Sequence, residues 1–579
     1  MSRLNPFQNG KTVRENQFPK AGGGSNRRKS AGGCERMMTA MPKRSVVVGA
    51  LLLAMFSGLM IKIYHLADSG LAQVADQQST VTVTVATARG TLYDRNMQPL
   101  VNTGTQNSIS VAPYPAAVAA LSEALTNEEF EALADRLQSG RPVTLTLDRL
   151  LAPTEGISQF SVPVRYSGDL AAPHLLGYLD GDGLHGVTGI ELAFDEYLSS
   201  KSGSVKVTYK VDGAGKPLQG IAPEIQNTLD EAKAGIVLSI DQQIQYIAEQ
   251  AAKKYIDRGA VVVLEPKTGQ VLAMVSLPDF QQDTLVEALD DERSPLLNRA
   301  LCNYNCGSVF KIVSAAAALE AGVSLSESHT CTGSINVGGI SFHCHNRLGH
   351  GVMSMVSGFA QSCNPYFIQL MQGVGGEALY TMATNLSFDR PLLLAENYKT
   401  ARAVLPSELE LQSPAAVANL SFGQGALLAT PMHIAQMVAA VVNGGEVIQP
   451  SVVKGFVDKA GNLEESAAAP AQWAFSEETA QTLHNLMVET VENGTGSGGK
   501  PRVGGAGCKT GTAETGWKND DGSEVVQSWY AGFYPAEQPE YVVVVLAEDA
   551  EGSGGQSTPV FREICDDLYT LGLSRQAEG

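Results

Sequence analysis

Three short motifs in this sequence contain the residue types of a serine nucleophile and its base, and each motif occurs more than once. Ser-x-x-Lys occurs at Ser308/Lys311, Ser451/Lys454 and Ser497/Lys500; Ser-x-Asn occurs at Ser334/Asn336 and Ser362/Asn364; and Lys-Thr-Gly occurs at 267–269 and 509–511. Motifs this short carry little information alone. The helices and strands expected to hold each copy must therefore separate them.

A serine nucleophile needs a base within hydrogen-bond reach, and residues three apart on a helix share one face. Only Ser308 opens a convincing helix, since an Ala-rich stretch follows it. Free N–H groups at the start of that helix would favour an oxyanion. Lys311 must be neutral to accept a proton, which burial and a second cation such as Lys509 would promote. The other two Ser-x-x-Lys copies lie in β-like and Gly-rich segments and are predicted to be surface features.

The two Lys-Thr-Gly copies differ in context. The first lies between the apolar runs "GAVVVLE" and "QVLAMVS", a pattern that predicts a β-hairpin with Gly269 in its turn. The second follows a Gly-rich loop and continues as "KTGTAE", where Gly511 would let a ligand backbone approach a strand closely. Thr510 and Thr512 would offer hydroxyls, and Thr512 a backbone N–H, to a substrate carboxylate or oxyanion.

The segment "AQSCNPYF" lies between these motifs. Ser362 is suited to relay a proton and Asn364 to hold an amide carbonyl, and Pro365 favours an extended conformation at Asn364. The chain order Ser308, Ser362, Lys509 is far more specific than any one of the motifs.

Charge and hydropathy divide the chain. Residues 1–44 contain ten Lys or Arg and two acidic residues, although the whole chain has a formal charge of −19. The next segment, "SVVVGALLLAMFSGLMIKIYHLA", predicts one membrane-spanning helix over 45–66, with the basic side cytoplasmic and the rest translocated. A cleaved signal peptide is the alternative, but no clear Ala-x-Ala site follows. The acidic remainder argues against nucleic-acid binding.

The chain has eight cysteines, of which Cys34 lies in the basic head. Cys302 with Cys306, or Cys331 with Cys344, are candidate disulfides. A Cys/His cluster invites a zinc interpretation, and its members are Cys331, His343, Cys344, His345 and His350. The spacing matches no standard Cys-x-x-Cys or His-x3-His clamp, so a disulfide or loop packing is favoured and no metal is predicted.

The remaining pattern predicts an α+β fold. Helices are expected at 127–138, at 189–200, after Asp241 as N-cap, and after Thr430 as N-cap. Late strands in "SWYAGFYP" and "EYVVVVLAED" and the early hairpin suggest an antiparallel sheet with strands from both ends of one domain, followed by a short helix in "PVFREICDDLYTLG". We expect a disordered basic tail at 1–44, the membrane helix at 45–66, a mixed domain at 67–234 and a second domain at 235–579.

With these motifs in order, the chain resembles the active-site serine penicillin-recognising enzymes, and among them the class B penicillin-binding proteins. "RGTLYDRNMQPL" and "GVTGIELAFDEYL" resemble the pedestal motifs of that class. "SIDQQIQ", "NRALCNYNCGSVFK", "GHGV", "FGQGALLATP" and "KTGTAE" resemble landmarks of its transpeptidase domain. Cys306 and Cys363 depart from the pattern, because the first stands where the family commonly has proline and the second lies inside the Ser-x-Asn motif.

The resemblance implies a pedestal domain at 67–234, a penicillin-binding transpeptidase domain at 235–579, and a D,D-transpeptidase that cross-links peptidoglycan stem peptides through an acyl-enzyme. It implies Ser308 as nucleophile, Lys311 as base, and N–H groups of Ser308 and Thr512 as the oxyanion hole. The other implied site residues are Ser362 and Asn364 in the second motif and Lys509, Thr510, Gly511 and Thr512 in the third.

The same resemblance implies nascent peptidoglycan as substrate, β-lactams as covalent inhibitors, a SEDS-type membrane glycan polymerase as partner, and no metal or organic cofactor. A D,D-carboxypeptidase or β-lactamase-type hydrolase stays open as an alternative, as does a catalytically weak scaffold of the division or elongation complex. A membrane-bound β-lactam sensor or a class A protein fits less well, since one membrane helix and no glycosyltransferase domain are expected.

Overall fold

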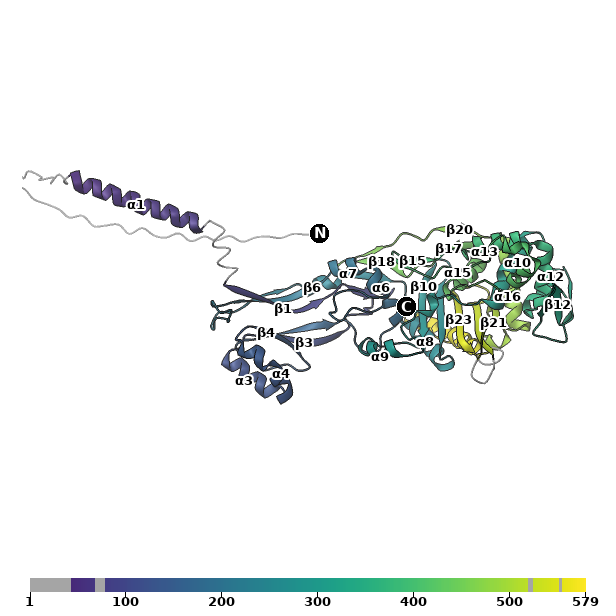
Figure 1. Cartoon of the computed structure of the whole chain (residues 1–579), viewed down its shortest axis with the longest axis horizontal. Coiled ribbons are helices and arrows are strands. Elements are labelled where there is room, and N and C mark those ends of the chain that lie inside the picture. Colours follow the sequence, from purple (N-terminus) through teal and green to yellow (C-terminus); the bar gives the residue numbers. More distant parts are fainter. Residues whose placement is uncertain (1–42, 68–78, 519–523, 551–554, 579) are drawn as a thin grey trace, which may run out of the picture. The chain divides into compact units, whose positions relative to one another are not determined.

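The computed structural model describes residues 43–67, 79–518, 524–550 and 555–578 (Figure 1). The chain separates into two compact units, residues 1–77 and 78–579. In the first unit, α1 (Lys43–Ala67) is a 25-residue apolar helix with no buried residue. Among the described residues it is the one helix long and apolar enough to cross a membrane. The predicted disordered tail and Cys34 lie outside the described residues.

Two small antiparallel sheets follow in the second unit. The first has the order β1-β6-β7, formed by β1 (Thr80–Ala88), β6 (Gly203–Lys210) and β7 (Glu224–Asn227). The second has the order β4-β3-β5, formed by β4 (Val143–Leu147), β3 (Gly104–Val111) and β5 (Ile157–Val164). Helices α3 (Pro115–Ala124) and α4 (Asn127–Gln138) pack on the second sheet. The predicted helix at 127–138 is confirmed, and a capping box at Thr126 starts it.

A buried ion cluster joins the two pedestal-like motifs. Glu191 lies in α6 (Gly189–Ala193) with no solvent exposure, and its carboxylate contacts Arg89 Nε at 3.0 Å and Arg165 Nη2 at 2.6 Å. Arg89 also contacts Asp195, the first residue of α7 (Asp195–Ser200), at 2.7 Å. Next to Arg89, β2 (Thr91–Tyr93) pairs in parallel with β8 (Gly235–Leu238), so this cluster anchors the start of the C-terminal region.

The central element is a five-stranded antiparallel sheet with the order β10-β9-β23-β22-β21. Its strands are β9 (Gly259–Glu265), β10 (Gln270–Leu277), β21 (Gly507–Lys518), β22 (Glu524–Tyr534) and β23 (Tyr541–Ala550). The early hairpin and the late strands therefore meet in one sheet, and the predicted α+β class is confirmed. The run of four valines at 542–545 is fully buried, because helices cover both faces of the sheet.

Successive side chains of each strand alternate between two cores. On one face, Val543 and Val545 pack with α8 (Gln242–Tyr255) and α17 (Ser557–Glu578). On the other face, Val542 and Val544 pack in the core that contains α15 (Pro431–Val442). Figure 1 shows these helices on either side of the strands. The N-caps predicted before α8 and α15 are both present.

The C-terminal helix α17 spans 22 residues and is longer than the short helix expected there. Its last turns are held by Arg575, whose guanidinium contacts the Asp241 carboxylate at 2.7 Å and the Gln243 amide oxygen at 2.8 Å. The amphipathic pattern of the sequence ends before these turns. The last turns of α17 therefore depend on the contact between Arg575 and Asp241, which a local pattern cannot reveal.

A mainly helical region lies against the β21 edge of the sheet. Its helices are α10 (Lys311–Glu320), α11 (Met355–Ala360), α12 (Asn364–Val374), α13 (Gly376–Asn385), α14 (Pro414–Ser421) and α16 (Glu477–Asn493). Eight consecutive residues of α10, Lys311 to Ala318, are buried, so α10 is the core helix of this region.

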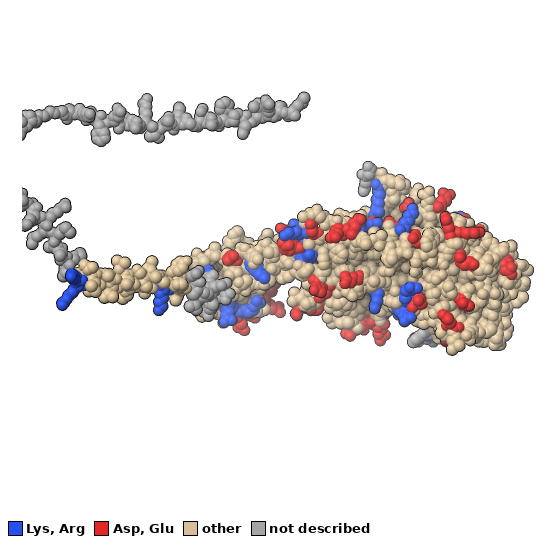
Figure 2. All heavy atoms as spheres, turned by 90° about the horizontal axis from the view of Figure 1, so that it is seen from above, with Lys and Arg blue, Asp and Glu red and all other residues tan. Residues whose placement is uncertain are grey.

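Short elements complete the described chain. The hairpin strands are β11 (His329–Cys331) with β14 (Gly351–Met353), β12 (Ser334–Val337) with β13 (Ile340–His343), β15 (Leu393–Ala395) with β16 (Tyr398–Lys399), and β17 (Glu446–Ile448) with β20 (Ala471–Trp473). The others are β18 (Val453–Val457), β19 (Leu463–Glu465), α5 (Pro173–Leu176) and α9 (Leu285–Asp290). Acidic and basic side chains are interspersed over the face of the molecule in Figure 2.

Candidate active site

Ser308 lies in a 3-10 turn, Gly307–Phe310, that leads directly into α10. The turn continues into the helix, so Lys311 stays on the same side and its Nζ lies 2.9 Å from Ser308 Oγ. Gly307 has φ +54°, and a Cβ at this position would lie 2.9 Å from the Thr512 carbonyl oxygen. A glycine is needed here because the backbone is left-handed and because a side chain would collide with β21. The Ser308 turn can therefore pack directly against β21.

The Ser362–Asn364 motif surrounds the amine of Lys311. Lys311 Nζ lies 2.8 Å from the Ser362 carbonyl oxygen, 3.2 Å from Ser362 Oγ and 2.7 Å from Asn364 Oδ1. Ser362 has φ +53°, in the left-handed region, which turns both of its oxygens toward the same amine. The second motif is therefore positioned by the turn between α11 and α12.

The prediction of an extended Asn364 is wrong. Asn364 is the first residue of α12, Pro365 follows it within the first turn, and the extended residue is Cys363, with ψ 113°. A proline in the first turn of a helix loses no intrahelical hydrogen bond, and this outweighs the preference it imposes on the preceding residue. The helical start directs Asn364 Oδ1 to Lys311 and lets Asn364 Nδ2 donate to the His343 carbonyl oxygen at 3.1 Å.

The second Lys-Thr-Gly lies on β21, the edge strand of the central sheet. Lys509 is fully buried, and its Nζ donates to Ser362 Oγ at 2.9 Å and to the Thr510 carbonyl oxygen at 3.0 Å. The half-buried Thr510 has its hydroxyl 2.6 Å from that of Thr495, a neighbour that the sequence pattern did not indicate. Thr512 is exposed. The Ser362 hydroxyl therefore bridges the two lysines.

Gly511 also has a packing role within the protein. A Cβ at Gly511 would lie 3.1 Å from Val309 Cγ1 and 3.2 Å from the Cys306 carbonyl oxygen. The missing side chain thus makes room for the turn that carries Ser308, on the inner side of the strand. The approach of a ligand backbone to Gly511 stays a prediction.

Burial and mutual repulsion govern the charge of the two lysines. Desolvation holds the pKa of Lys311 well below its usual range, and the nearby charge of Lys509 lowers it further. Desolvation also lowers the pKa of Lys509, to about 7. Burial and the nearby charge of Lys509 therefore both favour the neutral amine of Lys311.

A neutral Lys311 amine has two hydrogens and one lone pair. The Ser362 carbonyl and Asn364 Oδ1 can only accept hydrogen bonds, so they take the two N–H groups at 2.8 and 2.7 Å. The lone pair is then left for the hydroxyl group of Ser308, 2.9 Å away. This arrangement is a serine hydroxyl hydrogen-bonded to a desolvated base, which is suited to nucleophilic catalysis.

The other motif copies lie elsewhere. Residues 267–269 form the β9–β10 turn, where Gly269 has φ +71° as predicted and Lys267 is exposed. Ser334 and Asn336 belong to β12. Ser497 is exposed in a 3-10 turn, and Ser451 forms a bridge to Gln270. The structure brings together one copy of each motif, at Ser308, Ser362 and Lys509.

The segment ahead of Ser308 is held by buried contacts that sequence reasoning missed. Trp529 Nε1 on β22 donates to the Asn305 carbonyl oxygen at 2.9 Å. Arg299, almost fully buried, contacts Glu548 Oε1 at 3.2 Å, and Glu548 Oε2 contacts Arg258 at 3.1 Å. In the sequence, only the isolated Trp529 and the acidic Glu548 at the end of a valine-rich strand could have indicated these contacts.

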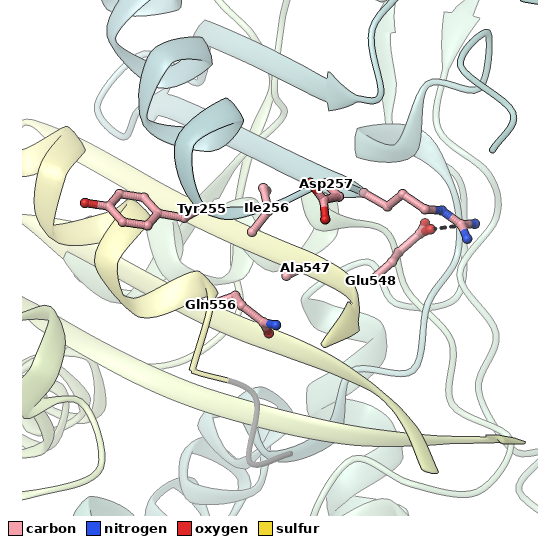
Figure 3. A pocket seen from close by; sticks show the side chains of 7 residues that line it. Tyr255, Ile256, Asp257, Ala547, Glu548 and Gln556 are labelled. Atoms are coloured by element: carbon pink, nitrogen blue, oxygen red, sulfur yellow. Dashed lines mark ion pairs between the residues drawn. The ribbon is translucent and has the colours of Figure 1, made fainter. Parts of the chain in front are cut away.

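Glu548 also lines a cavity of about 220 Å³ between the end of α8 and the end of β23 (Figure 3). The lining residues are Tyr255, Ile256, Asp257, Arg258, Ala547, Glu548 and Gln556. None of them belongs to the three motifs. The cavity therefore lies beside the Arg258–Glu548 ion pair and is separate from the Ser308 site.

The seven cysteines in the described part of the chain are all free thiols, so the candidate pairs Cys302–Cys306 and Cys331–Cys344 are not formed. The Cys/His cluster is arranged differently from the sequence expectation. Four ligand atoms lie within 4.8 Å of one another, and they belong to Cys331, Cys344, His350 and Cys363. Local spacing misses this group because its members come from four separate segments, one of which is the Ser-x-Asn motif that contains Cys363.

Comparison with known proteins gives this geometry a family. Residues 259–566 match the family model described as the penicillin binding protein transpeptidase domain. The chain is 31% identical over 423 residues to stage V sporulation protein D of Bacillus subtilis (strain 168), covering 69% of this chain and 63% of that protein. It is 28% identical over 586 residues to penicillin-binding protein PbpB of Mycobacterium tuberculosis (strain ATCC 25618 / H37Rv), covering 90% of this chain and 83% of that protein.

Solved structures agree with the fold. Penicillin-binding protein 3 of Mycobacterium tuberculosis, solved in complex with aztreonam, superposes with a TM-score of 0.61 at 25% identity, covering 85% of this chain and 97% of that chain. A peptidoglycan synthetase from Bifidobacterium adolescentis superposes with a TM-score of 0.64 at 21% identity, covering 85% and 97%. The chain therefore belongs to the class B penicillin-binding proteins. It spans less than two thirds of the length of the Bacillus subtilis relative, 63%.

Proposed function

We propose that this protein is a serine D,D-transpeptidase that cross-links peptidoglycan stem peptides through an acyl-enzyme on Ser308. The observation that carries the proposal is the contact of a buried, desolvated Lys311 amine with the Ser308 hydroxyl at 2.9 Å. Relatives named peptidoglycan D,D-transpeptidase PbpA, 32% identical over 53% of this chain, support the same reaction.

In the acylation step, Ser308 Oγ attacks the carbonyl carbon of the penultimate D-Ala, and its proton passes to Lys311 Nζ. Backbone N–H groups of Ser308 and Thr512 stabilise the oxyanion, since the Gly307 and Gly511 contacts hold the Ser308 turn against β21. The C–N bond to the terminal D-Ala then breaks. The Ser362 hydroxyl, which lies within hydrogen-bond distance of both lysines, relays a proton to the leaving amine.

Substrate recognition falls to the edge of β21. Lys509 keeps a positive charge beside Ser362, and Thr510 and Thr512 lie on an edge strand of the sheet, which an extended peptide can extend by one strand. Asn364 holds Lys311 with its Oδ1 and is suited to contact the amide of the stem peptide. In the second half-reaction, an amine of another stem attacks the acyl carbonyl, forms the cross-link and returns the proton to Ser308.

β-Lactams would acylate the same Ser308, because the strained lactam presents its carbonyl as the D-Ala-D-Ala peptide does. One solved neighbour, penicillin-binding protein A of Mycobacterium tuberculosis, is an imipenem acyl-enzyme complex, although at 23% identity it supports the fold alone. The position of α1 ahead of the pedestal supports a single-pass anchor with a cytoplasmic N-terminus and an extracytoplasmic catalytic domain. A SEDS-type polymerase as partner stays a prediction, as do the domain limits at residues 67 and 234.

The test is intact-mass spectrometry of the detergent-purified chain after incubation with a penicillin, comparing wild type with Ser308→Ala. We expect one adduct per wild-type chain, located on the peptide that contains Ser308, and none on the variant. Release of D-Ala from a D-Ala-D-Ala stem peptide should then require an added amine acceptor. Rapid loss of the adduct to water would favour the hydrolase alternative, and a wild type without any adduct would refute the proposal in favour of a scaffold.

A further inference from the structure

The cluster of Cys331, Cys344, His350 and Cys363 has the composition and the dimensions of a metal site. All four ligand atoms lie within 4.8 Å of one another. A tetrahedral zinc ion with Zn–S bonds of about 2.3 Å and a Zn–N bond of about 2.0 Å needs ligand atoms about 3.5 to 3.8 Å apart. Cys344 Sγ already lies 3.4 Å from His350 Nδ1, so small side-chain movements would complete the tetrahedron.

The environment also fits a closed structural site. Cys331, Cys344 and Cys363 are 2% exposed or less, whereas His350 is half-buried and borders solvent, which gives an ion a route of entry. Three free thiols in one buried cluster cannot all pair as disulfides, since one would always remain. Three thiolates and one imidazole are instead a standard closed ligand set for zinc, whose soft sulfur ligands disfavour magnesium and calcium.

The backbone around the cluster is built for close approach. Cys331 ends β11 and pairs with Gly351 at the start of β14, directly after His350. The Cys344 N–H donates to the Gly333 carbonyl oxygen at 3.0 Å, and a Cβ at Gly333 would lie only 2.1 Å from the Arg347 carbonyl oxygen. These contacts bring together the segments that carry Cys331, Cys344 and His350. The fourth ligand, Cys363, lies at the start of α12.

We propose that Cys331, Cys344, His350 and Cys363 form a structural zinc site that fixes the Ser362–Asn364 motif in place. Cys363 lies between the two residues that contact Lys311 Nζ, and Asn364 Nδ2 donates to the carbonyl oxygen of His343, next to Cys344. A metal on these ligands would tie the β11–β14 segment to the turn that holds Ser362 at φ +53°. The positioning role rests on the proposed function of Ser308 and Lys311; the metal site itself does not.

The first measurement is the zinc content of the full chain, purified in detergent and dialysed without added metal. We expect about one zinc ion per chain. Cys344→Ser and His350→Ala should lose it. Two matched controls should retain it: His345→Ala, whose ring lies 5.1 Å from that of His350 but belongs to no ligand set, and Cys565→Ala, a buried thiol on α17. Replacement by Co²⁺ should give thiolate-to-metal charge-transfer absorption in wild type and not in Cys344→Ser.

The second measurement is acylation by a fluorescent penicillin before and after chelation, on the same preparation. We expect a rate constant about 10- to 100-fold lower without metal, recovered on adding Zn²⁺, since displacement of a catalytic group by about 1 Å costs about that much. Ser308→Ala should bind zinc fully and never be acylated. Because His350 is half-buried on a loop, His350→Ala tests the site even if the cysteine variants fail to fold.

Three results would overturn the proposal. They are a wild-type chain without zinc, equal zinc loss in His345→Ala and His350→Ala, or a disulfide within the cluster found by mass spectrometry of alkylated peptides. A chain that binds zinc at this cluster but is never acylated would leave the metal site standing and refute the proposed function. A chain acylated at full rate after complete zinc removal would refute the positioning role.

Discussion

Replacing Asn364 by aspartate should disable Lys311 without changing the shape of the site. Asn364 Oδ1 lies 2.7 Å from Lys311 Nζ, so Asn364→Asp would place a carboxylate oxygen against the amine. At an effective dielectric constant of about 20, two opposite unit charges at this distance attract by about 6 kcal/mol. Desolvation of the new carboxylate offsets part of this energy. Even half of it, about 3 kcal/mol, would shift the equilibrium between the ammonium and neutral forms of Lys311 about 100-fold toward the ammonium form.

The assay is the second-order rate constant of acylation by a fluorescent penicillin, measured between pH 6 and pH 10, roughly the range over which a lysine of lowered pKa and an ordinary one titrate. In wild type, burial and Lys509 lower the pKa of Lys311. The Lys311 amine therefore becomes protonated, and stops acting as a base, only as pH falls through that lowered pKa. In Asn364→Asp the carboxylate raises the pKa of Lys311, so the ammonium form persists. We expect the rate of acylation by Asn364→Asp to fall at a higher pH than that of wild type, with a loss of up to about 100-fold on the acidic side of the profile and recovery as pH rises.

Asn364→Ala is the matched control, since it removes the same contact without adding charge. It should slow acylation by misplacing Lys311 but leave the pH profile where wild type has it. If Asn364→Asp and Asn364→Ala share one pH profile, Lys311 is not the neutral base and the proposed proton path is wrong.

Three further substitutions test the supporting structure. Glu191→Gln removes the buried carboxylate that Arg89 and Arg165 share, and although Arg89 keeps Asp195, the free energy of unfolding should fall by about 3 kcal/mol in urea titrations; a loss under about 1 kcal/mol would contradict the stabilising role of Glu191. Gly511→Ala presses a Cβ against Val309 and should slow acylation about 10- to 100-fold at a nearly unchanged unfolding midpoint; an unchanged rate would contradict the packing argument. Thr126→Ala removes the capping box of α4 and should destabilise that helix by about 1 kcal/mol, seen as faster amide exchange in α4 alone; slower acylation here would be unexpected.

The parts of the fold that were predicted from sequence depend on local patterns. Strand runs and N-caps such as Asp241 and Thr430 act through neighbouring residues, and the structure has them where the pattern placed them. The α+β class followed from the same patterns. The length of α17 did not, because its last turns depend on Arg575 and a carboxylate more than 300 residues earlier in the chain.

The candidate site shows the same division. The order of Ser308, Ser362 and Lys509 selected the copies that the fold brings together, because chain order reflects the topology of the whole domain. The conformation of Asn364 was predicted wrongly and the packing role of Gly511 was missed, since each depends on what the residue packs against. The Cys/His cluster was set aside for the same reason, as its ligands meet only after four segments have folded together.

The two Lys-Thr-Gly copies belong to the same sheet and differ in what covers them. Residues 267–269 form the turn between β9 and the edge strand β10, where Lys267 is exposed and keeps its hydration. Lys509 lies on the opposite edge strand, β21, fully buried and one hydroxyl away from Lys311. Burial makes the charge of Lys509 costly, and its proximity makes the charge of Lys311 costlier still. The lysine of the copy at 509–511 is buried because α16 and the turn that carries Ser308 pack on β21, whereas Lys267 and Thr268 of the other copy are exposed in a turn.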